Sequence, residues 1–179
     1  MRKIVSGLFI SLDGVIEAPN EWTGPLYNAE LGQTVGSMIA AQDAMLLGRV
    51  TYDEFAAYWP QQTGETADTM NGGAKYVVSG TLKSADWQNT TLIPAAGAAA
   101  GIAELKQRPG KNIGMTGSAT LVSWLLREGL LDELHLLVFP VVLGSGKRLF
   151  GEPGGKLPLK LLDSATFETG VVHLTYAKA

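Results

Sequence analysis

Three predicted strands of this chain end in glycine or small polar residues where a helix or turn begins. The segments are LLGRVT at 46–51, VVSGT at 77–81 and MTGSAT at 115–120. In open α/β sheets, ligands lie beyond the carboxyl ends of the strands, where helix N-termini offer unpaired N–H groups and partial positive charge. Glycine lets the backbone approach a phosphate closely, and Arg49 adds a guanidinium suited to phosphate or carboxylate. Together the three ends predict an anion site that could hold a dinucleotide. The alternative interpretation is that they are ordinary turns and helix caps.

The common sequence signatures of catalytic and nucleotide sites are absent. There is no G-x-G-x-x-G, and GSGKR at 144–148 matches only part of a phosphate loop, because Val141 stands at the first glycine and Arg148 replaces Ser/Thr. His135 and His173 lie in predicted strands without ligand spacing, so we interpret them as structural rather than as metal ligands. The absence of cysteine excludes disulfides, zinc–thiolate sites and cysteine nucleophiles.

Three carboxylates near the early loop could supply a proton: Asp13, Glu17 and Glu30. Each is also consistent with a solvated or capping side chain. No G-x-S-x-G nucleophile elbow accompanies them. The sequence therefore predicts no metal site and no covalent nucleophile.

Strands and helices alternate along most of the chain, and the C-terminal part is rich in strands. This order predicts an α/β fold with a mostly parallel sheet closed by an antiparallel hairpin, whose turn lies near Glu168–Gly170. We expect strands over 3–12, 44–47, 75–79, within 86–93, and over 112–116, 133–143 and 159–177 (the hairpin). We expect helices over 27–42, 50–58, 102–108 and 119–128, with 61–74 as a polar surface segment.

Length and composition favour one domain spanning 1–179. Of the 179 residues, 46% are hydrophobic, which is enough apolar surface for a substantial core. The net charge of −3 disfavours nucleic acid or an anionic membrane as partner. No apolar run reaches the roughly 18 residues of a membrane helix, and no signal peptide is recognisable, so we expect a cytoplasmic protein.

The order of these segments resembles a known superfamily. LLGRVTYDEF resembles the strand–Gly-Arg-x-Thr–helix segment of dihydrofolate reductases, and SLDGVIE followed by Trp22 resembles their first strand and active-site loop. NIGMTGSATLVSWLL followed by LLDELHLLVFPVVLGSGKRLF is closer to the reductase domain of riboflavin biosynthesis and its stand-alone bacterial relatives. The likeness covers nearly the whole chain and implies a dihydrofolate-reductase-like, three-layer α/β/α fold.

The resemblance implies NADPH as cofactor and assigns roles to particular residues. It places Arg49 near the 2′-phosphate and Ser79 at the adenosine end. Glu30, with Asp13, is the expected catalytic acid. The expected cofactor-binding residues are Gly48, Arg49, Thr51, Ser79, Thr116, Gly117, Ser118, Ala119 and Thr120. The expected substrate-binding residues are Ser11, Ile16 and Trp22.

The implied activity is an NADPH-dependent reduction of a pteridine-like or ribosylaminopyrimidine substrate by a homodimer. Gly80 stands where many relatives carry a basic residue, so the choice between NADP and NAD stays open. Two alternatives remain: a binding protein that keeps the nucleotide cleft without turnover, and a reductase of an unrelated carbonyl or nitro compound.

Overall fold

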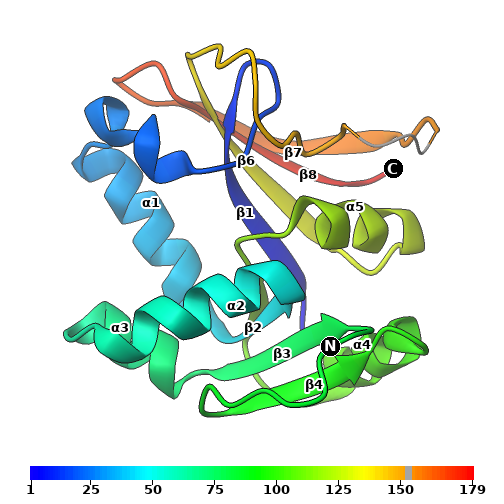
Figure 1. Cartoon of the computed structure of the whole chain (residues 1–179). Helices are drawn as coiled ribbons and strands as arrows, with labels where there is room; N and C mark the ends of the chain where they lie inside the picture. The colour runs from blue at the N-terminus through cyan, green and yellow to red at the C-terminus, as the bar shows by residue number, and fades with distance from the viewer. Residues whose placement is uncertain (152–154) are drawn as a thin grey trace.

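The computed structural model describes residues 1–151 and 155–179, and these form one eight-stranded sheet flanked by helices (Figure 1). The strand order is β4-β3-β2-β5-β1-β6-β8-β7. The strands are β1 (Ile4–Ser11), β2 (Gln42–Gly48), β3 (Ala74–Ser79), β4 (Thr90–Pro94), β5 (Asn112–Met115), β6 (Glu133–Phe139), β7 (Leu159–Thr166) and β8 (Val172–Lys178). The α-helices are α1 (Ala29–Ala40), α2 (Arg49–Tyr58), α3 (Glu65–Gly72), α4 (Ala98–Gln107) and α5 (Ala119–Glu128).

The sheet is parallel from β4 to β6 and antiparallel only where β8 pairs with β6 and β7. The predicted α/β class, with a parallel sheet and a C-terminal antiparallel hairpin, is therefore confirmed. Strand β1 lies in the middle of the sheet between β5 and β6. None of the helices in the described part of the chain combines the length and apolarity that crossing a membrane requires.

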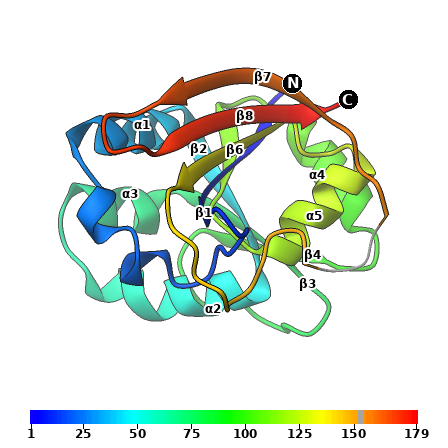
Figure 2. The same cartoon turned by 90° about the horizontal axis from the view of Figure 1, so that it is seen from above.

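Alternating side chains of each strand point to opposite faces of the sheet, and this decides where the core lies. Helices α4 and α5 cover one face with a buried cluster that includes Ile4 and Ile10 of β1 (Figure 2). On the other face, α2 and α3 pack on β2 and β3 through a second cluster that includes Met45 and Met70. Helix α1 is anchored on this face by Leu31, which lies in a third cluster with residues of β6 and the hairpin.

Two segments differ from the sequence-based expectation because tertiary burial outweighs local composition. The polar stretch 61–74 contains helix α3, whose Ala67 and Met70 are buried. Helix α4 begins at Ala98, within the low-complexity stretch, directly after Gly97 with φ 85°. Alanine is a strong helix former, so the low-complexity composition was compatible with helix.

Strand β6 ends at Phe139 rather than near Leu143. Pro140 follows it and has no N–H for a ladder hydrogen bond. The Leu143 N–H instead donates to Asp13 Oδ1 over 3.1 Å. The chain after β6 therefore turns toward the loop that follows β1.

Lys75 is a buried cation at the C-terminal end of α3, where its side chain has no exposed surface. Its Nζ donates to three carbonyl oxygens, those of Gly73 at 2.7 Å, Asn71 at 2.9 Å and Met70 at 3.0 Å. It also lies 4.2 Å from the ring centroid of Trp87. The amine satisfies carbonyls that a helix end leaves without intrahelical partners. Burial lowers the pKa of Lys75 to about 8.

We expect Lys75→Met to lower the free energy of unfolding by about 2–4 kcal/mol, because three hydrogen bonds of a buried amine are lost, and of their carbonyl acceptors Asn71 keeps a second donor, Gln88 Nε2. Urea unfolding followed by circular dichroism measures the change. Lys83→Met is the matched control, since Lys83 is exposed and its replacement should stay within about 0.5 kcal/mol of wild type. Equal stability of Lys75→Met and wild type would contradict this role of Lys75.

Candidate functional site

The turns that start α2 and α5 lie side by side, because β2 and β5 are parallel neighbours. A Cβ atom at Gly48 would lie 3.0 Å from Ser118 Oγ, and one at Gly117 would lie 3.0 Å from Thr51 Oγ1. Such separations are shorter than ordinary carbon–oxygen contacts, so each turn needs a glycine where it meets the hydroxyl of the other. The two helix starts therefore form one structural unit.

The two helix N-termini differ in how their backbone amides are satisfied. Ser118 caps α5, and its Oγ accepts a hydrogen bond from the Leu121 N–H over 3.3 Å. Gly48 caps α2 and has no side chain that could accept such a bond. The first N–H groups of α2 are thus available to a ligand, and the helix dipole favours an anionic one.

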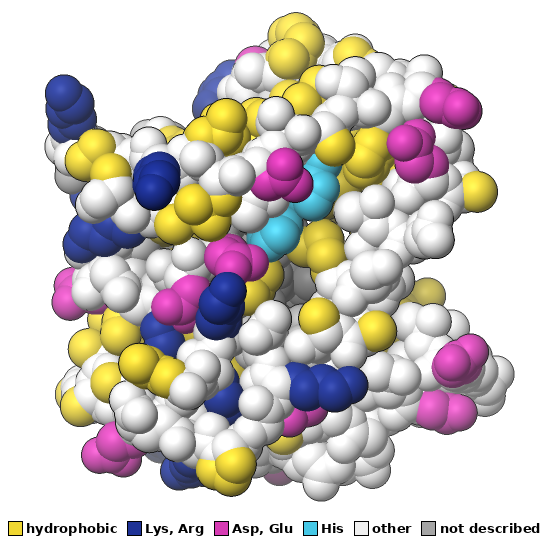
Figure 3. All heavy atoms as spheres, turned by 180° about the vertical axis from the view of Figure 1, so that it is seen from behind, with side chains coloured by type: hydrophobic (Ala, Val, Ile, Leu, Met, Phe, Trp, Pro, Cys, Tyr) yellow, Lys and Arg dark blue, Asp and Glu magenta, His cyan; other side chains and the backbone are white. Residues whose placement is uncertain are grey.

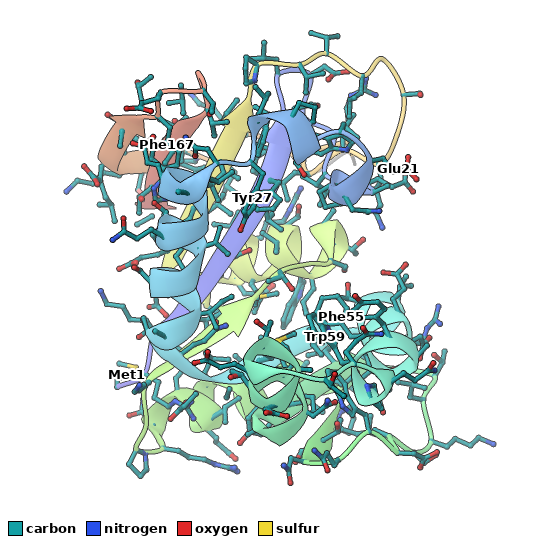
Figure 4. All side chains as sticks on the ribbon, turned by 90° about the vertical axis from the view of Figure 1, so that its left-hand side faces the viewer. Met1, Glu21, Tyr27, Phe55, Trp59 and Phe167 are labelled. Carbon is teal, nitrogen blue, oxygen red and sulfur yellow. The ribbon has the colours of Figure 1, made fainter. Side chains whose placement is uncertain are left out.

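A cleft of about 870 Å³ opens beside these helix starts, on the face of the sheet that carries α1 and α2. In Figure 4, Phe55 of α2 lies across the opening from the segment that carries Glu21. Of the residues expected to bind cofactor, those lining the cleft are Gly48, Arg49, Thr51, Thr116, Gly117, Ser118, Ala119 and Thr120. The structure brings the LLGRVT and MTGSAT segments together at one cavity.

Ser79 of the third predicted segment does not line this cleft, although its neighbour Val78 does. The Ser79 Oγ accepts hydrogen bonds from the N–H groups of Thr81 at 3.1 Å and Leu82 at 3.0 Å. Ser79 therefore closes the turn after β3. Its contact with the adenosine end of a cofactor stays a prediction.

Two cations line the cleft. Arg49 is half exposed, and its Nη1 lies 2.9 Å from Asp53 Oδ2 one turn along α2. Lys147 was not predicted as a site residue, although it belongs to the GSGKR segment that failed the phosphate-loop pattern. Its backbone carbonyl accepts from Ile16 N–H, and its own N–H donates to Glu17 Oε2 over 3.0 Å. Ile16 and Glu17 also line the cleft, as the early loop was expected to do.

Asp13 does not line the cleft, and its carboxylate is occupied in the structure. It accepts hydrogen bonds from Ser11 Oγ at 2.7 Å, Leu143 N–H at 3.1 Å and Gly144 N–H at 2.8 Å. These bonds, led by that from Ser11, hold the pKa of Asp13 well below its ordinary range. A carboxyl group that stays ionised is a poor proton donor, so the prediction of Asp13 as a catalytic acid does not fit.

Ser11 and Trp22 also have structural partners in place of a ligand. Ser11 is buried, and its Oγ accepts from Val15 N–H over 2.9 Å. The Trp22 indole donates to the Glu17 carbonyl at 2.9 Å and packs edge-on against Phe139. Neither residue lines the cleft, and their hydrogen bonds hold the loop that follows β1.

Glu30 lies on the first turn of α1 and points away from the main cleft. Its Oε2 accepts a hydrogen bond from the Glu168 N–H over 3.1 Å, which ties α1 to the turn of the hairpin. The residue lines a second, smaller hollow, which meets the cleft at Val5, Met38 and Gln42. The prediction that Glu30 donates a proton to the substrate does not fit this placement.

This second hollow, of about 510 Å³, contains a chain of hydrogen-bonded titratable groups. His135 Nδ1 lies 2.9 Å from His173 Nε2, and His135 Nε2 lies 3.2 Å from Glu133 Oε2. Figure 3 shows the two imidazoles side by side at the surface. Burial, and then the neighbouring His135, lower the pKa of His173. No group of three or more His, Cys, Asp or Glu side chains in the described part of the chain is arranged to hold a metal.

We expect His173 to make the protein less stable in mild acid. Its pKa in the folded state is below its ordinary value of 6.5, so the unfolded chain binds more protons as pH falls from there. The contribution of neutral His173 to the free energy of unfolding is fully present above the pKa of the unfolded chain. It is lost as pH falls through the lower pKa of the folded protein. The free energy of unfolding, measured in urea at about pH 7 and about pH 5, should fall less in His173→Gln than in wild type. An unchanged difference between the two pH values would contradict this expectation.

A model of the family described as the RibD C-terminal domain matches residues 2–173. The chain is 32% identical over 185 residues to the uncharacterized protein YyaP of Bacillus subtilis strain 168, which covers 98% of this chain and 94% of that protein.

Solved structures show the same fold. A candidate riboflavin biosynthesis protein from Shewanella sp. PV-4 superposes with a TM-score of 0.75 at 21% identity, covering 100% of this chain and 99% of that one. Dihydrofolate reductase from Enterococcus faecalis, complexed with NADP(H) and RAB-propyl, superposes with a TM-score of 0.64 at 11% identity, covering 98% of this chain and 96% of that one. The expected dihydrofolate-reductase-like three-layer fold is therefore confirmed.

Proposed function

The chain belongs to the RibD C-terminal domain family, and on this premise we propose that it is an NADPH-dependent reductase. The observation that carries the proposal is that the N-termini of α2 and α5 and the side chain of Arg49 converge on one cleft. Amide groups, helix dipoles and a guanidinium in one place favour a ligand with several phosphates. The volume of about 870 Å³ lies in the range of ligand and cofactor sites.

The residues present fit the phosphate-bearing half of this cofactor. The α2 N-terminus has free backbone amides. Because Gly48 has no side chain where it meets Ser118, backbone atoms face the cleft at this point. Arg49 is the residue we assign to the 2′-phosphate, while Thr116 and Thr120 expose hydroxyls beside the glycine turn. Bound NADPH supplies a hydride from its nicotinamide ring, and the chain orients the substrate against it.

The proton that completes the reduction comes from water in this proposal. Glu30 faces the second hollow, and Asp13 is held ionised by its hydrogen bonds. Glu17 and Glu54 are the carboxylates that line the cleft, and Glu17 is engaged by the Lys147 N–H. The pteridine-like or ribosylaminopyrimidine substrate, with a place in riboflavin biosynthesis, remains the prediction of the family resemblance.

A fluorescence titration with NADPH, followed by absorbance of the reduced nicotinamide with candidate substrates, tests the function. We expect saturable binding and substrate-dependent oxidation of NADPH. Binding without oxidation across a broad substrate panel would favour the alternative of a nucleotide-binding protein without turnover. No binding of NADPH would overturn the proposal.

Arg49→Ala should weaken the binding of NADPH by about tenfold or more and the binding of NADH much less. The reason is that a charge-assisted hydrogen bond to the 2′-phosphate contributes about 1.5–3 kcal/mol of binding free energy. Dissociation constants from the fluorescence titration give both values. Arg108→Ala is the matched control, since Arg108 is exposed beyond the end of α4 and outside the cleft. Equal losses for the two cofactors would show that Arg49 does not read the 2′-phosphate.

We also propose that the protein is a homodimer. Strand β7 ends the sheet, and its Leu161 and Leu162 are 50% and 48% exposed, which is unusual for neighbouring leucines on an edge strand. Light scattering at micromolar concentration should give twice the mass of the chain. A monomeric mass would reject the dimer.

A further inference from the structure

The inner face of α1 touches the sheet where Met38 lies over Gly7, and its apolar side chains also line the cleft. Val35, Met38 and Ile39 are each partly exposed, and Met38 and Ile39 belong to none of the three buried clusters. All three line the cleft. Apolar side chains on one stripe of a helix normally bury against the protein core. Here the stripe is left for a ligand to cover.

The opposite wall of this part of the cleft is equally apolar. It consists of β1 and β6, which contribute Val5, Phe9 and Leu137. Gly7 lies between Val5 and Phe9, and a Cβ at this position would collide with the Met38 methyl group. The missing side chain therefore lets the Met38 side chain of α1 lie directly against β1.

Charged groups of the cleft lie at its other end. Arg49 and Glu54 belong to α2, while Glu17 and Lys147 belong to the loops that follow β1 and β6. These positions are at the carboxyl edge of the sheet, whereas Val5 and Gln42 are near the starts of their strands. Six residues of strand span about 20 Å. No charged side chain among the described residues lines the cleft beneath α1.

One polar side chain does line the far end. Gln42 begins β2, and its carboxamide lies over Gly114 of β5, where a Cβ atom would overlap it. Among the described residues, no group forms a hydrogen bond with this carboxamide. A partly buried amide without a protein partner gains a hydrogen bond when a ligand reaches it.

We propose that the substrate of this reductase is an uncharged, largely apolar carbonyl compound with one hydrogen-bonding group at its far end, held by Gln42. This inference rests on the proposed function. A phosphorylated sugar bound beneath α1 would bring about −1.5 to −2 charges against apolar walls, away from Arg49 and Lys147, which is costly.

The reaction balances with the cofactor of the proposed function. The carbonyl carbon gains a hydrogen with its electron pair from NADPH, and the π electrons of the C=O bond move to oxygen. The oxygen takes a proton from water, giving an alcohol and NADP⁺. The apolar walls exclude bulk water from the ring face, and burial of apolar surface supplies the binding free energy at about 25 cal/mol per Å².

A matched pair of aldehydes tests the inference. The probes are 6-methoxy-2-naphthaldehyde, which is uncharged, and 6-formyl-2-naphthoate, which carries a carboxylate at the same ring position. Calorimetry measures binding of each to the protein with and without NADP⁺, and absorbance measures NADPH oxidation. We expect the uncharged aldehyde to bind at least tenfold more tightly and to be reduced with the larger kcat/KM.

Two variants and one control variant test which residues decide the preference for the uncharged aldehyde. Met38→Lys places a cation in the apolar pocket and should shift the ratio of the two affinities at least tenfold toward the naphthoate. Ala40→Lys adds the same charge to the same helix outside the cleft and should leave the ratio unchanged. Gln42→Met should weaken the methoxy compound about tenfold, with NADPH affinity preserved as the check on folding.

The outcomes separate the two proposals. If the wild-type protein does not bind NADPH, the proposed function is overturned. Normal NADPH binding together with equal or tighter binding of the naphthoate would overturn the substrate inference and leave the function standing. Binding of neither aldehyde in the presence of NADP⁺ would also overturn the substrate inference.

Discussion

The contact between two glycine turns is the constraint on which the candidate site depends. Parallel pairing of β2 with β5 puts the starts of α2 and α5 at the same edge of the sheet. Each turn then reaches the other only because Gly48 and Gly117 have no side chain where Ser118 and Thr51 stand. Any Cβ there would push the helix starts apart. The same close approach that packs the helices leaves backbone amides facing the cleft, which is why packing and anion binding share these residues.

One face of the sheet carries the largest apolar cluster, and the other face carries the candidate site. Helices α4 and α5 bury a continuous apolar cluster on one face, and this cluster supplies most of the hydrophobic driving force. On the other face, α1 is fixed at its start by the Asn28 cap, by Leu31 and by the bond from Glu168 to Glu30. Further along, α1 touches β1 where Met38 lies over Gly7, and its apolar side chains line the cleft. Apolar surface left exposed in this way costs stability and is available for ligand binding.

Carboxylates near the cleft mainly stabilise its rim. Asp13 joins the turn after β1 to the segment after β6, and Glu17 receives the Lys147 N–H of that segment. A backbone bridge between Val15 and Arg148 runs between these two contacts. The hydrogen bonds to Asp13 also stabilise its ionised form, so this carboxyl group is a poor acid.

The sequence alone determined the fold class, and it predicted that two glycine-containing helix starts meet at one candidate site, because both follow from local patterns. Strand–glycine–helix segments at Gly48 and Gly117 are contiguous in the chain, and the alternation of strands and helices predicts a parallel sheet. Local patterns did not predict the direction of Glu30 or the partners of Asp13 and Ser79. They also did not predict that Lys147 and Gln42 line the cleft. Each depends on contacts between residues far apart in sequence, as between Glu30 and Glu168. Only the tertiary structure decides such contacts, since a side chain's direction follows from the packing of its whole element.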